Sequence, residues 1–203
     1  MAEPATEKGR RAKQSIVQSA ADLVAQRGIV DTFIDDVLES CGMGKSQFYH
    51  YFADKDELIT EVVRFRSETL FREMYFEPLS AISTLTGLRR WIRQFAEMMV
   101  QANYTQGCPI GTLAMQLNQS ETLLRSEINN VMDEFHRSLH GALRRIREKG
   151  QLPERVDTGE LATYFLGVFQ GGLLLSRTYR DPTKLRTVLL QAEKHLKQLA
   201  GQH

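Results

Sequence analysis

The chain is organised around the stretch TFIDDVLESCGMGKSQFYHYF, residues 32–52, which is typical of two short helices joined by a tight turn. Thr32 and Asp35 form a candidate capping box, in which a hydroxyl and a carboxylate three residues later bind free backbone amides. Gly42 supplies the turn, since glycine enters positive φ at little cost. The first helix places its apolar residues on one face, and these are Ile34, Val37, Leu38 and Cys41. The stretch therefore predicts a helix-turn-helix.

The second helix of this stretch, from about Gly44, has a polar side and an aromatic side. Phe48, Tyr51 and Phe52 can anchor it to a scaffold, which it needs because an isolated helix of about two turns is unstable. The polar side consists of Lys45, Ser46, Gln47, Tyr49 and His50. These side chains can bond phosphates and base edges, so the pattern predicts a helix that is presented to nucleic acid.

The composition indicates a soluble globular protein. Of the 203 residues, 42% are hydrophobic and 25% are charged, and no apolar run approaches the length of a membrane span. The charged N-terminus does not have the form of a signal peptide, and two cysteines without close pairing indicate a reducing compartment. We therefore expect a cytoplasmic protein. The net charge of +1 gives no global attraction to nucleic acid, so any DNA contact depends on local clusters of charge.

Helices are predicted on both sides of the central stretch. Apolar spacing from Arg11 to Arg27 predicts a scaffold helix that Gly28 ends, after a disordered arm over residues 1–7. Asp54 and Glu57 form a capping box for a long helix to about Phe76, with Pro78 after its end. Further helices are expected over 85–104, 110–117, 121–149 with Ser120 as cap, 157–178, and from Asp181 and Pro182 onward. The sequence thus predicts an all-α chain of nine helices without strands.

The segment CGMGKSQFYHYFADKDEL, residues 41–58, resembles the signature of the TetR family of transcriptional regulators, which is close to AGVSKGTFYHYFxSKEEL. The resemblance covers roughly residues 10–60. It implies a TetR-like architecture with an N-terminal DNA-binding domain, residues 1–53, and a C-terminal ligand-binding and dimerisation domain, residues 54–203. It further implies a ligand-released repressor that binds a palindromic operator on double-stranded DNA as a homodimer.

The resemblance assigns DNA contacts residue by residue. Tyr49 and Lys55 match phosphate contacts, and Thr32 is included among the expected DNA-binding residues. Base contacts are expected from the exposed side of the second helix, namely Lys45, Ser46, Gln47 and His50. Arg10 and Arg11 belong to a basic cluster that can lie along phosphates or, equally, form a solvated helix start. Phe33, Gly44 and Asp35 depart from the family pattern, so the base preference is not predicted.

The last two predicted helices form an informative pair. The first has an apolar surface wider than one internal face needs, and the second has a stripe of leucines. Gly167, Gly171 and Gly172 would let another backbone approach closely, as in a four-helix dimer interface. One helix fully buried in a monomer core explains the same pattern, so both interpretations stand on the sequence alone.

Cys108 lies in the segment YTQGCPIGTLAMQLNQ, residues 104–119. The segment resembles the GCLxGNLA stretch of a TetR subgroup that includes acrylate-responsive and N-ethylmaleimide-responsive repressors. That resemblance implies that Cys108 corresponds to a cysteine that senses electrophiles, and a position just before a helix start at Pro109 would favour its thiolate. A small side chain packed at a helix junction is the structural alternative.

A small-molecule effector site is expected inside the C-terminal domain. Its candidate residues are Trp91, Phe95, Met98, Tyr104, Cys108, Met115, Phe135, His136 and Tyr164. Aromatic and methionine stripes also form ordinary cores, and a histidine in an apolar run is often structural. We expect no metal and no cofactor. No phosphate loop, metal-spaced cluster or activated nucleophile indicates an enzyme, and a helical protein-interaction module is the remaining alternative.

Overall fold

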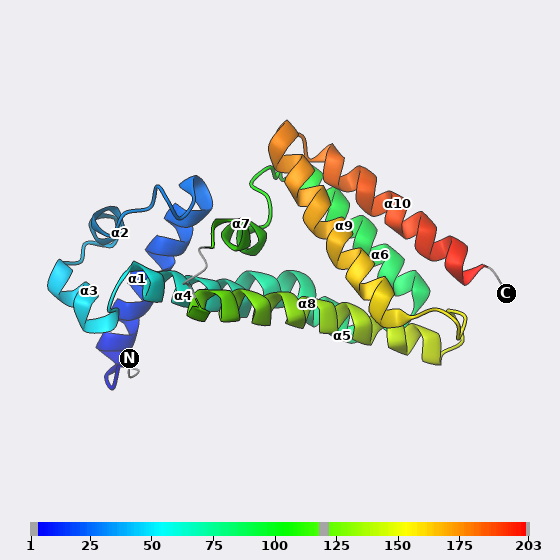
Figure 1. Ribbon diagram of the computed structural model, residues 1–203, viewed down its shortest axis with the longest axis horizontal. Helices are drawn as coiled ribbons and strands as arrows, with labels where there is room; N and C mark the ends of the chain where they lie inside the picture. Colours follow the sequence, from blue (N-terminus) through cyan, green and yellow to red (C-terminus); the bar gives the residue numbers. More distant parts are fainter. Residues whose placement is uncertain (1–3, 118–121, 202–203) are drawn as a thin grey trace. The chain divides into compact units, whose positions relative to one another are not determined.

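The computed structural model describes residues 4–117 and 122–201, and its regular structure over those residues is entirely helical (Figure 1). The elements are α1 (Glu7–Arg27), α2 (Ile34–Cys41), α3 (Lys45–Tyr51), α4 (Lys55–Arg66), the π-helical segment η1 (Ser67–Phe76), α5 (Glu77–Ala81), α6 (Leu85–Gln101), α7 (Pro109–Gln116), α8 (Thr122–Glu148), α9 (Thr158–Tyr179) and α10 (Thr183–Ala200). Because α4, η1 and α5 follow one another without a break, the described residues form nine continuous helical runs, as predicted. None of these helices is long and apolar enough to cross a membrane.

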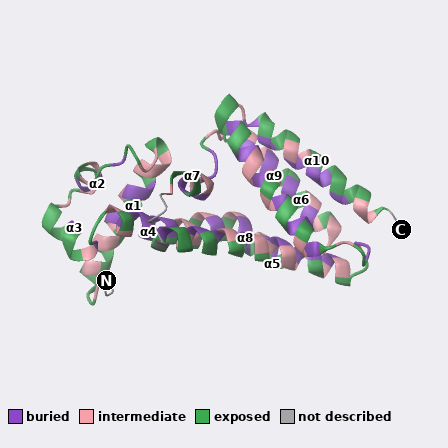
Figure 2. Ribbon diagram, viewed as in Figure 1, coloured by how far each residue is buried: buried purple, intermediate pink, exposed green. Residues whose placement is uncertain are grey.

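The chain divides into two compact units. The head unit consists of residues 1–70 with residues 112–131, and the body unit consists of residues 71–111 with residues 132–203. Along the helices, buried residues recur beside exposed ones, as expected for amphipathic helices (Figure 2).

In the head unit, α1 packs against α4 and α2, and α2 packs against α3. The core between them is built from both aliphatic and aromatic side chains. Its buried members are Ile16, Val17, Ala20, Ala21, Val37, Leu38, Phe48, Phe52, Leu58 and Val62. The apolar face predicted for the first helix of the motif is confirmed, because Val37 and Leu38 are buried while Ile34 and Cys41 pack partly buried against them.

Two predicted helix starts in the head unit are wrong. α1 begins at Glu7 rather than near Arg11, because the Thr6 hydroxyl accepts the Gly9 amide at 3.1 Å and caps the helix earlier. The predicted Thr32 capping box is also absent from α2. Phe33 is the N-cap residue there, and the Thr32 hydroxyl instead donates to the Gly28 carbonyl at 2.6 Å.

Ion pairs connect the scaffold helices of the head unit. Lys13 on α1 lies 3.1 Å from Glu61 on α4, and both side chains are largely shielded from solvent. Arg64, also on α4, contacts Glu127 at 2.5 Å, which joins α4 to the first turns of α8. Partly buried pairs are screened less by salt than exposed ones, so these contacts help to fix the scaffold that carries α2 and α3.

The long helix extends further than predicted. Pro78 was expected after its end, but the helical run continues through Pro78 to Ala81. The proline lies in the first turn of α5, directly after the π spacing of η1. A proline is tolerated at such a point because the α-type hydrogen-bond ladder is already interrupted there.

The body unit contains a bundle in which α10 packs against α9 and α6 (Figure 1). Gly172 permits the close approach of α9 and α10, since a Cβ at this position would lie 2.6 Å from side-chain atoms of Leu185 and Val188. Glu193 on α10 is buried and accepts hydrogen bonds from Arg89 and Arg93 on α6. Shape and charge thus both fix α10 within the unit.

Three predicted helix boundaries in the body unit are confirmed. Asp157 caps α9 by accepting the Gly159 and Glu160 amides, and Gly150 follows α8 with a φ of 69°. Asp181 accepts the Thr183 amide at 2.9 Å before α10. The cap predicted at Ser120 lies outside the described residues.

Candidate nucleic-acid interface

The helix-turn-helix fixes α3 through its aromatic side. Phe48 and Phe52 are fully buried, with ring centroids 5.3 Å apart. Gly42 adopts a φ of 67°, and the Met43 amide donates to the Leu38 carbonyl at 2.9 Å, which closes α2 and redirects the chain. A seven-residue helix therefore has a defined orientation that its own hydrogen bonds could not maintain.

The other side of α3 is exposed, as predicted. Its exposed residues are Lys45, Ser46, Gln47, Tyr49 and His50. Lys45 pairs with Asp35 on α2 at 3.0 Å, but both side chains are about two thirds exposed, so the pair is weak and Lys45 can exchange partners. The Gln47 side chain accepts the Gly44 amide at 3.2 Å and so caps its own helix, which leaves its amide N–H groups for another acceptor.

Lys55 and Thr32 differ in how accessible their side chains are to a ligand. The Lys55 ammonium donates to the Ile29 carbonyl at 2.6 Å and lies 5.9 Å from the Phe33 ring, which positions it at the start of α4 with two further N–H groups. Thr32 is 2% exposed and its hydroxyl is bound to the Gly28 carbonyl. The structure therefore leaves Lys55 partly exposed at the start of α4, whereas Thr32 is buried.

The start of α4 is anchored by acidic side chains. Asp54 accepts the Glu57 amide at 2.9 Å, and Glu57 accepts the Ala53 amide at 2.7 Å. The bond from the Ala53 amide lowers the pKa of Glu57, so this carboxylate remains ionised and holds the chain between α3 and α4.

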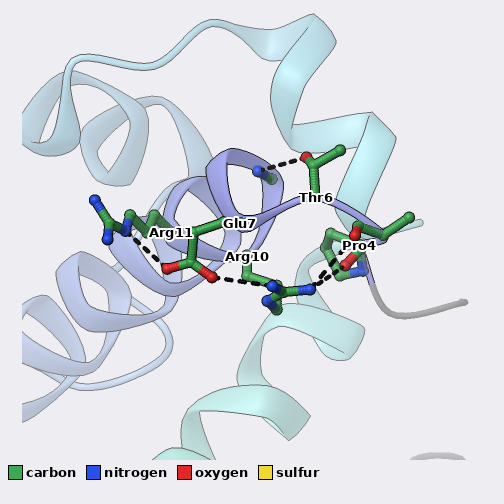
Figure 3. Close-up of polar contacts among 7 residues, drawn as sticks. Pro4, Thr6, Glu7, Arg10 and Arg11 are labelled. Atoms are coloured by element: carbon green, nitrogen blue, oxygen red, sulfur yellow. Dashed lines mark hydrogen bonds and ion pairs between the residues drawn. The ribbon is translucent and has the colours of Figure 1, made fainter.

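Arg10 and Arg11 lie in the first turns of α1, so the basic cluster forms part of a helix start (Figure 3). Both guanidinium groups bond Glu7, at 3.0 Å from Arg10 and 2.9 Å from Arg11. Arg10 also donates to the Pro4 and Ala5 carbonyls. Their side chains are 52% and 78% exposed, so the two positive charges are accessible at the start of α1. The ion pairs with Glu7 orient both arginine side chains.

Comparisons with known proteins agree with this geometry. Residues 16–62 match the family described as bacterial regulatory proteins, tetR family, and residues 84–192 match the tetracyclin repressor-like C-terminal domain. The second match alone covers more than half of the chain. The chain belongs to the TetR family. It is accordingly a DNA-binding transcriptional regulator with an all-helical TetR-like fold.

Several TetR-type relatives are similar over most of the chain. The transcriptional regulator AcuR of Cereibacter sphaeroides is 22% identical, over 91% of this chain and 84% of its own. An HTH-type transcriptional regulator of Mycobacterium tuberculosis is 28% identical, over 87% of this chain and 89% of its own. The crystal structure of a TetR family regulator from Cytophaga hutchinsonii superposes with a TM-score of 0.84 at 15% identity, over 98% and 100% of the two chains.

Three of the predicted effector residues share one aromatic cluster in the body unit. Trp91, Phe95 and Phe135 belong to this cluster, which also contains Tyr75 and Phe169. The ring of Tyr75 packs against Phe95 and Phe135, and the ring of Phe169 packs against Trp91. Sequence reasoning missed Tyr75 and Phe169. Phe169 is on the predicted dimer helix, and Tyr75 is on η1, where π spacing turns residues away from the direction that α periodicity predicts.

The remaining effector candidates are exposed or have other hydrogen-bond partners, and Met115 belongs to the head unit. Met98, Met115 and Tyr164 are 42%, 76% and 42% exposed. His136 is bonded through Nε2 to the Gly159 carbonyl and the Thr163 hydroxyl, as a structural histidine would be. The Tyr104 hydroxyl donates to the Gly107 carbonyl at 2.9 Å.

Cys108 is not an activated thiol. It is 6% exposed, and burial raises the pKa of the thiol despite hydrogen bonds from the Gly111 amide and the Gln170 side chain. The expectation that the start of α7 favours the thiolate is therefore wrong in direction. Desolvation of the charged form outweighs the donors at the helix start.

Proposed function

We propose that α3 enters the major groove of an operator and reads base edges through Lys45, Ser46, Gln47 and His50. The observation that carries this proposal is the row of exposed polar side chains on a short helix whose opposite side is fixed by Phe48 and Phe52. A helix that is rigidly held and polar outward suits base readout, because recognition needs side chains in fixed register with the groove.

Phosphate contacts are proposed for the residues that flank this helix. Tyr49 is 58% exposed, and Lys55 has N–H groups left after bonding Ile29. Arg10 and Arg11 add positive charge at the start of α1. Contacts of this kind supply affinity and orientation without sequence information.

We further propose that α9 and α10 form the interface of a homodimer, so that two heads bind the two halves of a palindrome. Support comes from exposed apolar residues on α9, with Tyr164, Leu174 and Leu175 at 42%, 49% and 38% exposure. Beyond the chain neighbours and the backbone of α9 itself, no atom of the described residues lies within 4 Å of a Cβ placed on Gly167 or Gly171, so those positions leave room for a second backbone. Gly172 differs, since the space beside it is filled by α10.

The regulator is proposed to be a cytoplasmic repressor that a small molecule releases. In this assignment residues 1–53 bind DNA, and residues 54–203 hold the effector and the dimer interface. Trp91, Phe95 and Phe135 are the effector contacts that the fold supports best, because they share one cluster. An effector that binds better to a dimer with wrongly spaced heads weakens DNA binding by that differential affinity.

The test uses a duplex from the region upstream of the protein's own gene. Each half of this duplex and single-base variants of it are tested separately, and the affinity for each is measured by fluorescence anisotropy. Tyr49→Phe should weaken binding to every duplex by about tenfold, since one phosphate hydrogen bond is lost. Gln47→Ala should cost about 1–3 kcal/mol at one position of each half-site and little elsewhere. Glu39→Ala, which changes an exposed residue on the preceding helix, is the control for general surface effects.

Uniform effects of both substitutions on all duplexes would contradict the assignment of Gln47 to base readout. A separated half-site that binds as tightly as the full duplex would contradict the dimer. Light scattering of the free protein, with Leu175→Glu as the variant expected to be monomeric, checks the dimer independently of DNA.

A further inference from the structure

Tyr75 lies at the centre of the aromatic cluster in the body unit. Its ring is within contact distance of rings from η1, α6, α8 and α9. The centroid distances are 5.1 Å to Phe71, 6.4 Å to Trp91, 5.3 Å to Phe95, 4.6 Å to Phe135 and 6.2 Å to Phe169. The residue is 6% exposed. A single phenol ring thus fills the place that the other rings surround.

The π spacing of η1 is what delivers this ring to the cluster. A π-helix has about 4.4 residues per turn against 3.6 in an α-helix, so each residue advances about 82° instead of about 100°. From Ser67 to Tyr75 the difference accumulates to roughly 150°. If η1 continued α4 with α spacing, Tyr75 would point away from the direction it now takes.

The same spacing brings a second aromatic residue onto this side of η1. Phe71 and Phe76 are five residues apart, which separates them by about 140° around an α-helix but by only about 50° around a π-helix. Both are buried, and their ring centroids are 6.2 Å apart. Burial of aromatic side chains is therefore the compensation for a helix geometry that is otherwise rare.

We propose that Tyr75 occupies the effector's place in the free protein, and that the effector is a neutral molecule with a single aromatic ring, which displaces Tyr75 as η1 changes from π to α spacing. This inference rests on the effector site proposed above. A ring-lined space that accepts a phenol side chain in tilted and edge contacts suits a free ring of the same size. Burial also raises the pKa of Tyr75 well above its usual range, so the space favours an uncharged occupant.

The displacement has a direct route along the chain. η1 and α4 form one uninterrupted helix, and α4 contributes Leu58 and Val62 to the core of the head unit. A change of register in η1 rotates and lengthens that helix between Tyr75 and α4, because α spacing rises further per residue than π spacing. The effector thereby biases a two-state element, as allosteric coupling requires.

The experiment follows binding of phenol and of cyclohexanol through Trp91, the only tryptophan of the chain, and amide hydrogen exchange over residues 67–76. Wild type should bind phenol saturably below about 10 mM, with slower exchange over 67–76 as α-type hydrogen bonds form. Cyclohexanol should bind about tenfold more weakly, because it lacks a ring face. Tyr75→Ala should bind phenol at least about tenfold more tightly than wild type, since no internal ring competes.

Phe165→Ala is the matched control, because it removes a buried ring of α9 whose neighbouring ring is Tyr164 rather than Tyr75. Because Tyr75 stays in place, phenol should still slow exchange over 67–76 only at the concentrations that wild type requires. Tyr75→Phe keeps the ring and should behave as wild type. Should Tyr75→Ala fail to fold by circular dichroism, Tyr75→Leu replaces it, with a smaller gain of about threefold expected.

Equal phenol affinities of wild type and the folded Tyr75→Ala or Tyr75→Leu variant would overturn the proposal, as would equal binding of phenol and cyclohexanol or unchanged exchange in phenol-bound wild type. A separate titration with operator duplex distinguishes this inference from the proposed function. If phenol binds while the operator duplex stays bound, the proposed release of DNA by an effector is contradicted. The aromatic binding site inferred here is then still supported.

Discussion

The two units each contain buried aromatic rings, but the rings are assembled differently. In the head unit, Phe48 and Phe52 come from the same short helix and its end, one helical turn apart. In the body unit, Tyr75, Phe135 and Phe169 come from three elements that are far apart in the sequence. The seven residues of α3 depend on the head rings for their orientation, whereas the body rings lie on longer helical runs.

This difference matches the tasks proposed for the two units. A helix that reads bases must not change its orientation, whereas a site that responds to a ligand must have a second arrangement available. A ring cluster formed within one short helix suits a fixed orientation. A cluster assembled from several helices suits a site with a second arrangement.

The largest expected effect tests the rigidity of the head. Phe48→Ala should lower the free energy of unfolding of the head unit by about 3–5 kcal/mol, because it leaves a cavity behind α3, and should abolish operator binding. Urea unfolding with anisotropy on the operator checks both. His50→Ala, on the exposed side of α3, should leave stability within about 0.5 kcal/mol. A Phe48→Ala protein that still binds the operator normally would end the contrast between the two clusters.

A second prediction concerns the polar anchor of the body. Glu193→Gln should lower stability by about 2 kcal/mol, because the buried acceptor of Arg89 and Arg93 loses its charge. Operator affinity should stay the same at temperatures where the variant is folded, since the head rings are untouched. Calorimetry and anisotropy check the pair of outcomes. Lys184→Gln, which affects an exposed pair with Asp181, should change stability far less.

The same carboxylate sets a dependence on pH. Burial by itself raises the pKa of Glu193, but the bonds from Arg89 and Arg93 outweigh it, so the folded pKa lies below the ordinary value. The stability that the Glu193 carboxylate contributes is therefore fully present above the ordinary glutamate pKa of about 4.3. It is lost as the pH falls through the lowered pKa of the folded state. Between pH 7 and acid, wild type should lose more stability than Glu193→Gln in parallel urea titrations. Parallel curves for the two proteins would exclude this linkage.

A smaller effect separates the two kinds of glycine on α9. Gly172→Ala should cost about 1–2 kcal/mol, because the new methyl group meets Leu185 and Val188. Gly167→Ala, with open space beside it, should stabilise the isolated helix slightly and weaken the proposed dimer. Thermal unfolding together with sedimentation at several concentrations distinguishes folding from dimerisation. Equal costs for both substitutions would argue against the different roles assigned to them.

The smallest expected effect concerns Cys108. Because its thiol pKa is raised by burial, alkylation by iodoacetamide at pH 7 should be at least about tenfold slower than that of glutathione and should accelerate as pH rises. Mass spectrometry of the Cys108 peptide measures the rate. Fast alkylation at neutral pH would restore the electrophile-sensing interpretation and would place a reactive group beside the aromatic cluster.

The sequence by itself determined the features that depend on neighbours in the chain. The alternation of Val37, Leu38, Phe48 and Phe52 with polar residues specified the helix-turn-helix, and Gly42 and Asp157 specified a turn and a cap, because such interactions span three or four residues. The exposed row on α3 followed from the same periodicity, and so did the all-helical fold.

Only the tertiary structure decided the features that depend on distant partners. Gly172 receives α10 instead of a second subunit, and burial reverses the expected shift at Cys108. Tyr75 was missed because its direction depends on π spacing, which helical periodicity in the sequence does not encode. In each case the free energy of packing or desolvation exceeds a local preference of about 1 kcal/mol, so the outcome is set by what the folded chain brings together.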